Sequence, residues 1–197
     1  MSNHLLLLHG YTQNGDVILN KVSKLVSKSF LDNYTIISPN GSYQIEEEKR
    51  GWWNLESPEM FNKPHKYENY EDAIKIVQES LKDVKEEDNL FIIGFSQGSV
   101  LCEIMLIHNL FNIIPKKVVL ISPSGIMDSR LYKSSKIDIG IPLLVIIGKK
   151  EGIFGISNEN YEKDSYIEKY DIENHEAGHV IPSNSKTKNL IKLWITI

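Results

Sequence analysis

Cysteine is almost absent from this sequence: the chain has 197 residues and a single cysteine, Cys102. One cysteine can form neither an internal disulfide nor a cysteine-based metal cluster, and it is typical of a reducing compartment. A long hydrophobic run is missing at the start of the chain as well. Residues 5–8 are apolar, but four residues are too few for a signal peptide or a membrane span. We therefore expect a soluble cytoplasmic protein without a membrane span or a metal site.

Basic charge is not in excess. The chain has 22 lysines and arginines against 26 aspartates and glutamates, a net charge of −4, and the two signs are interspersed. Such a chain offers no basic face to a phosphate backbone, so we expect no nucleic-acid partner. Hydrophobic residues make up 41 % of the chain. This composition and length predict one globular domain over residues 1–197.

Short apolar runs alternate along the chain with longer segments of helical periodicity. The runs of strand length are residues 5–8, 35–37, 90–93, 118–121 and 143–147, with a sixth, more alternating candidate at 166–172. Helical spacing of apolar residues is found at 17–30, 71–84, 99–110 and 184–195. This alternation predicts an α/β fold, a three-layer sandwich with about six mostly parallel strands in the order 2-1-3-4-5-6.

Residues 38–69 interrupt this rhythm, because they show no clear periodicity and contain the pair Trp52-Trp53. A loop longer than about 15 residues in a compact domain is usually a functional lid or is disordered. Adjacent tryptophans argue against disorder, since large aromatic side chains are usually buried. We interpret the segment as an ordered flap beside the active site. The alternative is a packed loop that only covers the sheet edge.

The motif Gly94-Phe95-Ser96-Gln97-Gly98 joins a predicted strand to a predicted helix. A sharp turn there needs glycines on both sides, and it leaves the serine exposed at the carboxyl end of the strand. We predict Ser96 as a nucleophile. Two backbone N–H groups must then hold the negative oxygen of the tetrahedral intermediate. We predict that Gln97 supplies one and that Tyr11, which follows the first strand, supplies the other.

A serine nucleophile needs a base, and two histidines follow the last predicted strand, where a parallel sheet presents active-site residues. We predict His179 as the base. His175 is either a supporting hydrogen-bonding residue or only a histidine at the end of a strand. Glu151 is the predicted acid, because it stands three residues past the glycine that ends strand 143–147. The alternative for Glu151 is a charged loop residue beside two lysines.

These motifs together resemble those of the FSH-type serine hydrolase family, within the α/β-hydrolases, over nearly the whole chain. The resemblance rests on residues 7–15, on Arg50-Gly51-Trp52-Trp53, on residues 94–98, and on His175-x-x-Gly178-His179-x-x-Pro182. It implies an α/β-hydrolase fold and a carboxylesterase that acts on acyl or alkyl esters without a cofactor. We expect the substrate to be a small-molecule acyl ester, or a thioester. The resemblance also implies that the second histidine of the closing motif is catalytic. The family normally carries aspartate where this sequence has Glu151.

Some assignments stay open. Trp52, Trp53 and Phe154 are candidates for the wall of an acyl pocket, with a core role as the alternative for each. A flavodoxin-like binding module would share the predicted strand order, although it would have no use for His179. A catalytically inactive hydrolase that only binds acyl compounds is a further alternative. A yellow protein after soaking with a flavin would favour the flavodoxin-like module, and labelling by a fluorophosphonate probe separates an active hydrolase from an inactive one.

Overall fold

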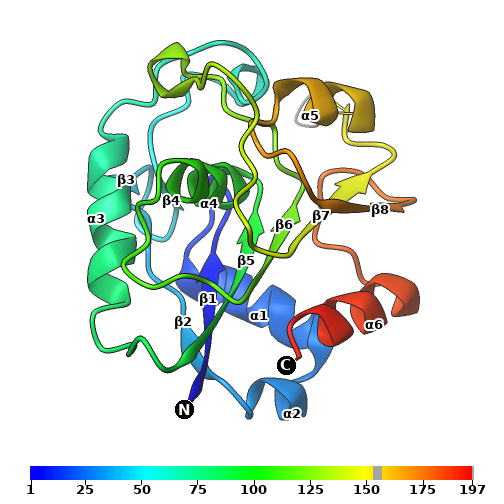
Figure 1. The fold of residues 1–197 in the computed structure, drawn as a ribbon. Coiled ribbons are helices and arrows are strands. Elements are labelled where there is room, and N and C mark those ends of the chain that lie inside the picture. Colours follow the sequence, from blue (N-terminus) through cyan, green and yellow to red (C-terminus); the bar gives the residue numbers. More distant parts are fainter. Residues whose placement is uncertain (153–156, 197) are drawn as a thin grey trace.

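The computed structural model describes residues 1–152 and 157–196. Its main sheet has six strands, all parallel, in the order β2-β1-β5-β6-β7-β8 (Figure 1). The strands are β1 (Asn3–Leu8), β2 (Thr35–Ile37), β5 (Asn89–Phe95), β6 (Lys117–Ile121), β7 (Leu143–Gly148) and β8 (Asp171–His175). Numbered among themselves, they follow the order 2-1-3-4-5-6, so the predicted fold is confirmed.

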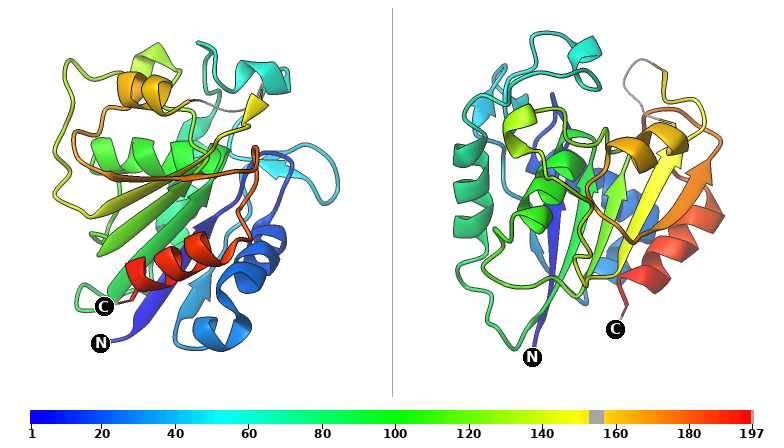
Figure 2. Two further views of the ribbon diagram at one scale, coloured as in Figure 1. Left: turned by 90° about the vertical axis from the view of Figure 1, so that its right-hand side faces the viewer. Right: turned by 45° about the horizontal axis from the view of Figure 1, so that its top comes forward.

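Helices cover both faces of this sheet and make three layers (Figure 2). They are α1 (Gly15–Val26) and α6 (Ser185–Trp194) on one face, and α3 (Tyr70–Ser80) and α4 (Gln97–Ile107) on the other. Alternate residues of a strand pack against opposite helix layers. Leu5 and Leu7 pack toward α1, whereas Leu6 and Leu8 pack toward α4. A strand buried on both faces must be apolar throughout, which is why these strands are visible in the sequence.

Short elements complete the chain. They are α2 (Lys28–Leu31), the antiparallel pair β3 (Tyr43–Gln44) and β4 (Arg50–Gly51), the 3-10 turns η1 (Pro58–Met60) and η2 (Ser129–Leu131), and α5 (Asn158–Asp164). The loop of residues 38–69 lies at the carboxyl ends of the strands, as the cyan segment at the top of Figure 1. No helix among residues 1–152 and 157–196 has the length and apolar character needed to cross a membrane.

Most elements lie within a few residues of their predicted bounds, and two differ in a way that the structure explains. The helix expected over 17–30 is interrupted at Ser27, whose φ of 77° lies in the left-handed region. The sixth strand begins at Asp171 instead of 166, because Ile167 pairs with Ile137 in an isolated bridge outside the sheet. At its other end, this edge strand extends to His175 instead of ending at 172.

Candidate active site

Ser96 lies at the turn between β5 and α4, with φ 54° and ψ −120°. A residue other than glycine seldom adopts such a conformation, and strain of this kind is concentrated at active sites. The flanking glycines make the turn possible. A Cβ on Gly94 would lie 2.8 Å from the Ser99 Cα, and one on Gly98 would lie 2.2 Å from the Leu8 carbonyl oxygen. The two glycines of the predicted motif are therefore required by close backbone packing.

His179 bridges Ser96 and Glu151. Its Nε2 lies 2.8 Å from the Ser96 Oγ, and its Nδ1 lies 2.5 Å from the Glu151 Oε2. We assign the proton to Nδ1, because the carboxylate can only accept, and this leaves Nε2 free to take the serine proton. The His179 and Glu151 side chains are 15 % and 5 % exposed. Three residues far apart in the sequence thus form one hydrogen-bonded line.

Glu151 is held by more than the histidine. Its Oε1 accepts hydrogen bonds from the Ser122 hydroxyl at 2.7 Å and from the Gly148 N–H at 2.8 Å. Burial by itself would raise the pKa of the Glu151 carboxyl. The hydrogen bonds from His179, Ser122 and Gly148, with the charge of His179, outweigh burial and hold that pKa below its usual value. Glu151 is therefore ionised at neutral pH.

The predicted N–H donors belong to the two turns that meet at Ser96. Tyr11 lies in the turn after β1, where the Gln13 N–H donates to the Gly10 carbonyl at 3.2 Å, and Gln97 is the first residue of α4. Within the described part of the chain, neither the Tyr11 nor the Gln97 N–H has an acceptor. A Cβ on Gly10 would lie 3.2 Å from the Ser96 Cβ. Glycine at this position lets the first turn approach the serine closely.

A buried histidine fixes the first turn. His9 Nδ1 donates to the Gly10 carbonyl oxygen at 2.8 Å, and its Nε2 accepts from the Gly41 N–H at 2.9 Å. Its ring stacks on Trp52, whose indole N–H donates to the His9 carbonyl oxygen at 2.8 Å. Burial lowers the pKa of His9 to about 4, so the ring is neutral at pH 7. His9 is structural.

The tryptophan pair belongs to the core. Trp52 and Trp53 are 0 % and 1 % exposed, and Trp53 stacks on Tyr67 with ring centroids 4.2 Å apart. The Gln97 side chain accepts from the Trp52 N–H at 2.8 Å and donates to the Trp53 carbonyl oxygen at 3.0 Å. The pair therefore ties the loop to the serine turn and does not line the cavity, so the core alternative holds. Phe154, the third predicted pocket residue, lies outside the described residues.

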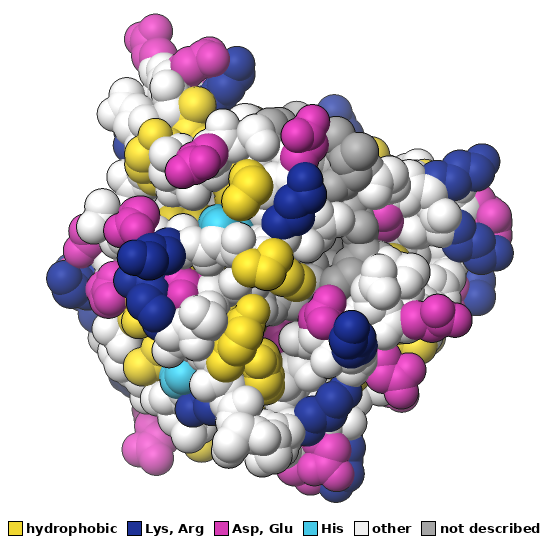
Figure 3. All heavy atoms as spheres, turned by 90° about the horizontal axis from the view of Figure 1, so that it is seen from above, with side chains coloured by type: hydrophobic (Ala, Val, Ile, Leu, Met, Phe, Trp, Pro, Cys, Tyr) yellow, Lys and Arg dark blue, Asp and Glu magenta, His cyan; other side chains and the backbone are white. Residues whose placement is uncertain are grey.

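A cavity of about 520 Å³ opens beside Ser96, His179 and Glu151. The other residues that line it include both apolar or aromatic and polar side chains: Tyr11, Leu55, Phe61 and Phe95, and Thr12, Gln13 and Lys21. The rings of Phe61 and Phe95 lie 5.7 and 5.4 Å from that of His179. Apolar side chains form a band across the face at the carboxyl ends of the strands, with charged side chains around it (Figure 3). Leu55 and Phe61 come from the loop of residues 38–69, which thus contributes to the site.

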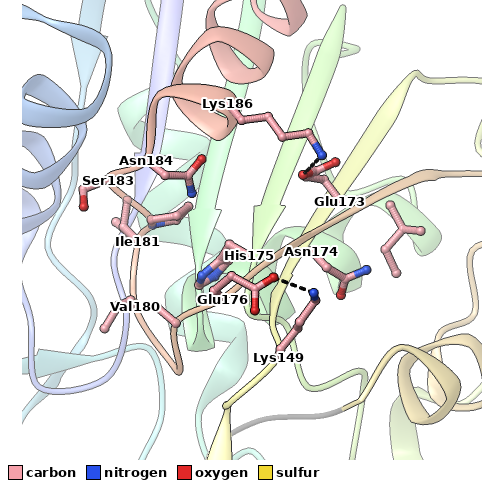
Figure 4. Close-up of a pocket in the computed structure, with 13 residues that line it drawn as sticks. Lys149, Glu173, Asn174, His175, Glu176, Val180, Ile181, Ser183, Asn184 and Lys186 are labelled. Atoms are coloured by element: carbon pink, nitrogen blue, oxygen red, sulfur yellow. Dashed lines mark hydrogen bonds and ion pairs between the residues drawn. The ribbon is translucent and has the colours of Figure 1, made fainter.

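His175 lies away from Ser96. It faces a second cavity, about 600 Å³, on the outer side of β8, which Ser96 does not line (Figure 4). His175 is 3 % exposed, and neither ring nitrogen has a hydrogen-bond partner among the described residues. Burial lowers the pKa of His175, so this ring is neutral too. Within residues 1–152 and 157–196, His175 therefore does not make the supporting hydrogen bond considered for it.

Sequence reasoning missed several residues of the site. Ser122 directly follows β6 and could have been found by the logic that finds Tyr11, Ser96 and Glu151, since each comes soon after the end of a strand. Phe61 and Lys21 carry no such signal, because one lies in an aperiodic loop and the other on a helix. Across residues 1–152 and 157–196, no group of three His, Cys, Asp or Glu residues is arranged to hold a metal ion.

The chain is similar to several known proteins. The family model described as serine hydrolase (FSH1) matches residues 1–191. An esterase of Drosophila pseudoobscura pseudoobscura is 28 % identical over 211 residues, and the alignment covers 93 % of this chain and 68 % of the esterase. An esterase of Drosophila melanogaster is 28 % identical over 206 residues, and that alignment covers 93 % of this chain and 70 % of the esterase. The crystal structure of a carboxylesterase from Mesorhizobium loti has a TM-score of 0.73 at 17 % identity, covering 98 % of this chain and 88 % of that one. The structural likeness supports the fold.

Proposed function

Because the chain belongs to the serine hydrolase (FSH1) family, we propose that Ser96, His179 and Glu151 are its catalytic triad and that it cleaves small carboxylic esters, or thioesters. The observation that carries the proposal is the line from Glu151 through His179 to Ser96, with distances of 2.5 and 2.8 Å, beside a cavity. No cofactor is needed for this chemistry.

In the first half of the reaction, the Ser96 Oγ attacks the ester carbonyl carbon while His179 Nε2 removes the hydroxyl proton. The N–H groups of Tyr11 and Gln97 stabilise the negative oxygen of the tetrahedral intermediate. The ionised Glu151 stabilises the imidazolium and keeps its Nδ1–H oriented. When the intermediate collapses, the alcohol leaves with the proton from Nε2, and the acyl group stays on Ser96.

In the second half, a water molecule attacks the acyl-enzyme while His179 Nε2 removes one of its protons. The same two N–H groups stabilise the second tetrahedral intermediate. His179 returns the proton to the Ser96 Oγ as the carbon–oxygen bond to serine breaks. The carboxylic acid is released and the enzyme is regenerated.

The test is covalent labelling of Ser96. A fluorophosphonate probe should label the wild-type protein, and Ser96→Ala should abolish labelling and lower turnover of an activated ester by about 10³- to 10⁶-fold. Ser99→Ala is the matched control, because this serine lies one helical turn away on α4 and its hydroxyl bonds to the backbone of Ile121. Ser99→Ala should keep both labelling and turnover.

The alternatives from sequence give different outcomes. An inactive acyl-binding protein would take no label, although short-chain fatty acids would still raise its melting temperature. A flavodoxin-like module would bind flavin, which a yellow protein after soaking would reveal. Near-normal turnover by Ser96→Ala with an intact circular dichroism spectrum contradicts the assignment of the nucleophile.

We also propose that residues 1–197 form one domain located in the cytoplasm. The two core clusters pack on opposite faces of the same sheet, which supports a single cooperative unit. One sharp thermal transition would be expected. The location rests on the single, buried Cys102, and fractionation of cells would test it.

A further inference from the structure

Lys21 brings a positive charge to the cavity beside Ser96. It lies on α1, is partly buried, and lines this cavity together with Thr12 and Gln13. Of the described residues around the cavity, it is the only lysine or arginine. Leu55 and Phe61 also line the cavity, and their side chains are apolar. The cavity therefore offers a substrate one apolar surface and one cationic group.

The Phe95 ring lies near both the Lys21 ammonium group and the His179 ring. Lys21 Nζ lies 5.6 Å from the centroid of the Phe95 ring, in a cation–π contact. The Phe95 ring lies 5.4 Å from the His179 ring. A substrate with its ester at Ser96 and a charged group at Lys21 would therefore lie along the Phe95 ring.

No carboxylate of the described residues pairs with Lys21 within 4.0 Å. The cavity at β8 differs, because Lys149 pairs there with Glu176, and Lys186 with Glu173 at 2.7 Å (Figure 4). The lysines of that cavity are therefore neutralised by the protein, whereas Lys21 has its charge available for a ligand.

Glu151 does not cancel this charge. Its Oε2 contacts His179, and its Oε1 accepts from Ser122 and from the Gly148 N–H. The carboxylate is thus directed to the histidine and satisfied by three donors. It needs no further partner from Lys21.

We propose that Lys21 is a specificity-determining residue that selects esters carrying a carboxylate in addition to the ester bond. This inference rests on the proposed function and names its substrate class: monoanionic esters with an apolar segment between the two groups. The carboxylate can belong to the acyl part, as in a half ester of a dicarboxylic acid, or to the alcohol part. Lys21 binds it in both cases, and the experiment distinguishes them.

The test uses two pairs of esters matched in size. For the acyl side, the mono-p-nitrophenyl ester of adipic acid is compared with its terminal amide. For the alcohol side, 3-carboxyphenyl butyrate is compared with 3-carbamoylphenyl butyrate. The readout is the ratio of kcat/KM for the acid to that for the amide, since a general loss of activity cancels in this ratio.

The wild-type enzyme should prefer the acid in one of the two pairs by about 10- to 150-fold, the range expected for a hydrogen bond to a charged group. Lys21→Met, which keeps an apolar stem over Phe95, should reduce the ratio to about one, and Lys21→Glu should invert it. Lys24→Met is the matched control, because Lys24 lies one turn later on α1 and is exposed. It should keep the wild-type ratio.

Two results would overturn the proposal: a wild-type ratio near one in both pairs, or an unchanged ratio in both Lys21 variants. Failure of the proposed function looks different, since none of the four esters would then be cleaved and no fluorophosphonate label would form. Monomethyl adipate would still decide the role of Lys21 in that case. If it raises the melting temperature of the wild type and Lys24→Met but not of Lys21→Met, the inference stands, and equal shifts refute it.

Discussion

Two buried glutamates, one at the tip of β7 and one inside α4, have opposite electrostatics. Glu151 is 8 % exposed, and Glu103 is 0 % exposed. The pKa of Glu151 lies below its usual value, whereas burial raises the pKa of Glu103 to about 7. The difference comes from their partners, because burial raises the pKa of both.

The partners of Glu103 are neutral. Ser165 donates to its Oε1 at 2.7 Å, and the Tyr161 hydroxyl donates to its Oε2 at 3.3 Å. The hydrogen bonds and the charge of Lys136 lower the pKa only in part. Glu151 has an additional partner, the histidine that gains charge during the proposed reaction. One carboxyl is therefore suited to stabilise a cation, and the other to tie α4 to the segment that follows α5.

The largest expected effect is the loss of turnover when Glu151 is replaced. Glu151→Gln should lower kcat by about 10³- to 10⁴-fold, because an amide offers the His179 Nδ1–H no charge and can favour the wrong tautomer. Steady-state turnover of a p-nitrophenyl ester measures the loss. Glu103→Gln, the same substitution at the buried site that is not part of the triad, should change kcat by less than about 3-fold.

A conservative variant sharpens the assignment. Glu151→Asp should recover about 10-fold over Glu151→Gln, because the negative charge is restored but the carboxylate is one methylene shorter. Equal turnover by Glu151→Gln and the wild type would remove Glu151 from the proposed triad. Ser96 and His179 would remain assigned.

The second effect is on stability, and Glu103 should dominate it. Its pKa in the folded protein, about 7, exceeds the usual 4.5, so the folded state binds this proton more tightly. The stabilisation is complete below pH 4.5 and is lost as the pH rises to about 7. Its size is on the order of 3 kcal/mol, from about 1.4 kcal/mol for each unit of the rise from 4.5 to about 7.

Glu103→Gln is uncharged at every pH and should not show this decline. Urea unfolding of both proteins between pH 4 and 8 measures the difference in the free energy of unfolding. The wild type should lose stability relative to the variant between pH 4.5 and 7. Parallel curves for the two proteins would show that Glu103 titrates normally.

The two glutamates also show which features of the structure can be predicted from the sequence. Glu151 could be predicted because it follows a strand end, and parallel strand ends converge on one edge of the sheet. The environment of Glu103 could not, because it depends on Ser165 and Tyr161, which are about sixty residues away in the sequence. The central strands could also be located from their apolar runs, since burial on both faces leaves a local pattern.

Local patterns failed where tertiary contacts decide the structure. Nothing near Ser27 signals its left-handed backbone, so the first helix was predicted too long. The alternation at 166–172 resembles a strand, although Ile167 pairs outside the sheet. Trp52 and Trp53 are candidates for both core and pocket in the sequence, and the structure buries both in the core and away from the lining of the cavity. Lys21 lies on a helix, and only its long side chain reaches the cavity.

The smallest effect tests what keeps Glu151 in place. Ser122 donates to its Oε1 at 2.7 Å and comes from a different strand end, so it shares the support of the carboxylate with the Gly148 N–H. Ser122→Ala removes one of two donors to that oxygen while the bond to His179 remains. A hydrogen bond to a charged group contributes about 1.5–3 kcal/mol, but the backbone donor compensates for part of the loss. We expect kcat to fall by about 5-fold, with KM unchanged, because only the orientation of the base is affected. The two variants separate loss of the charge from misorientation of the base, because adding Glu151→Gln to Ser122→Ala should lower kcat further. If Ser122→Ala alone lowered kcat as much as Glu151→Gln does, then Ser122, and not the carboxylate, would position His179.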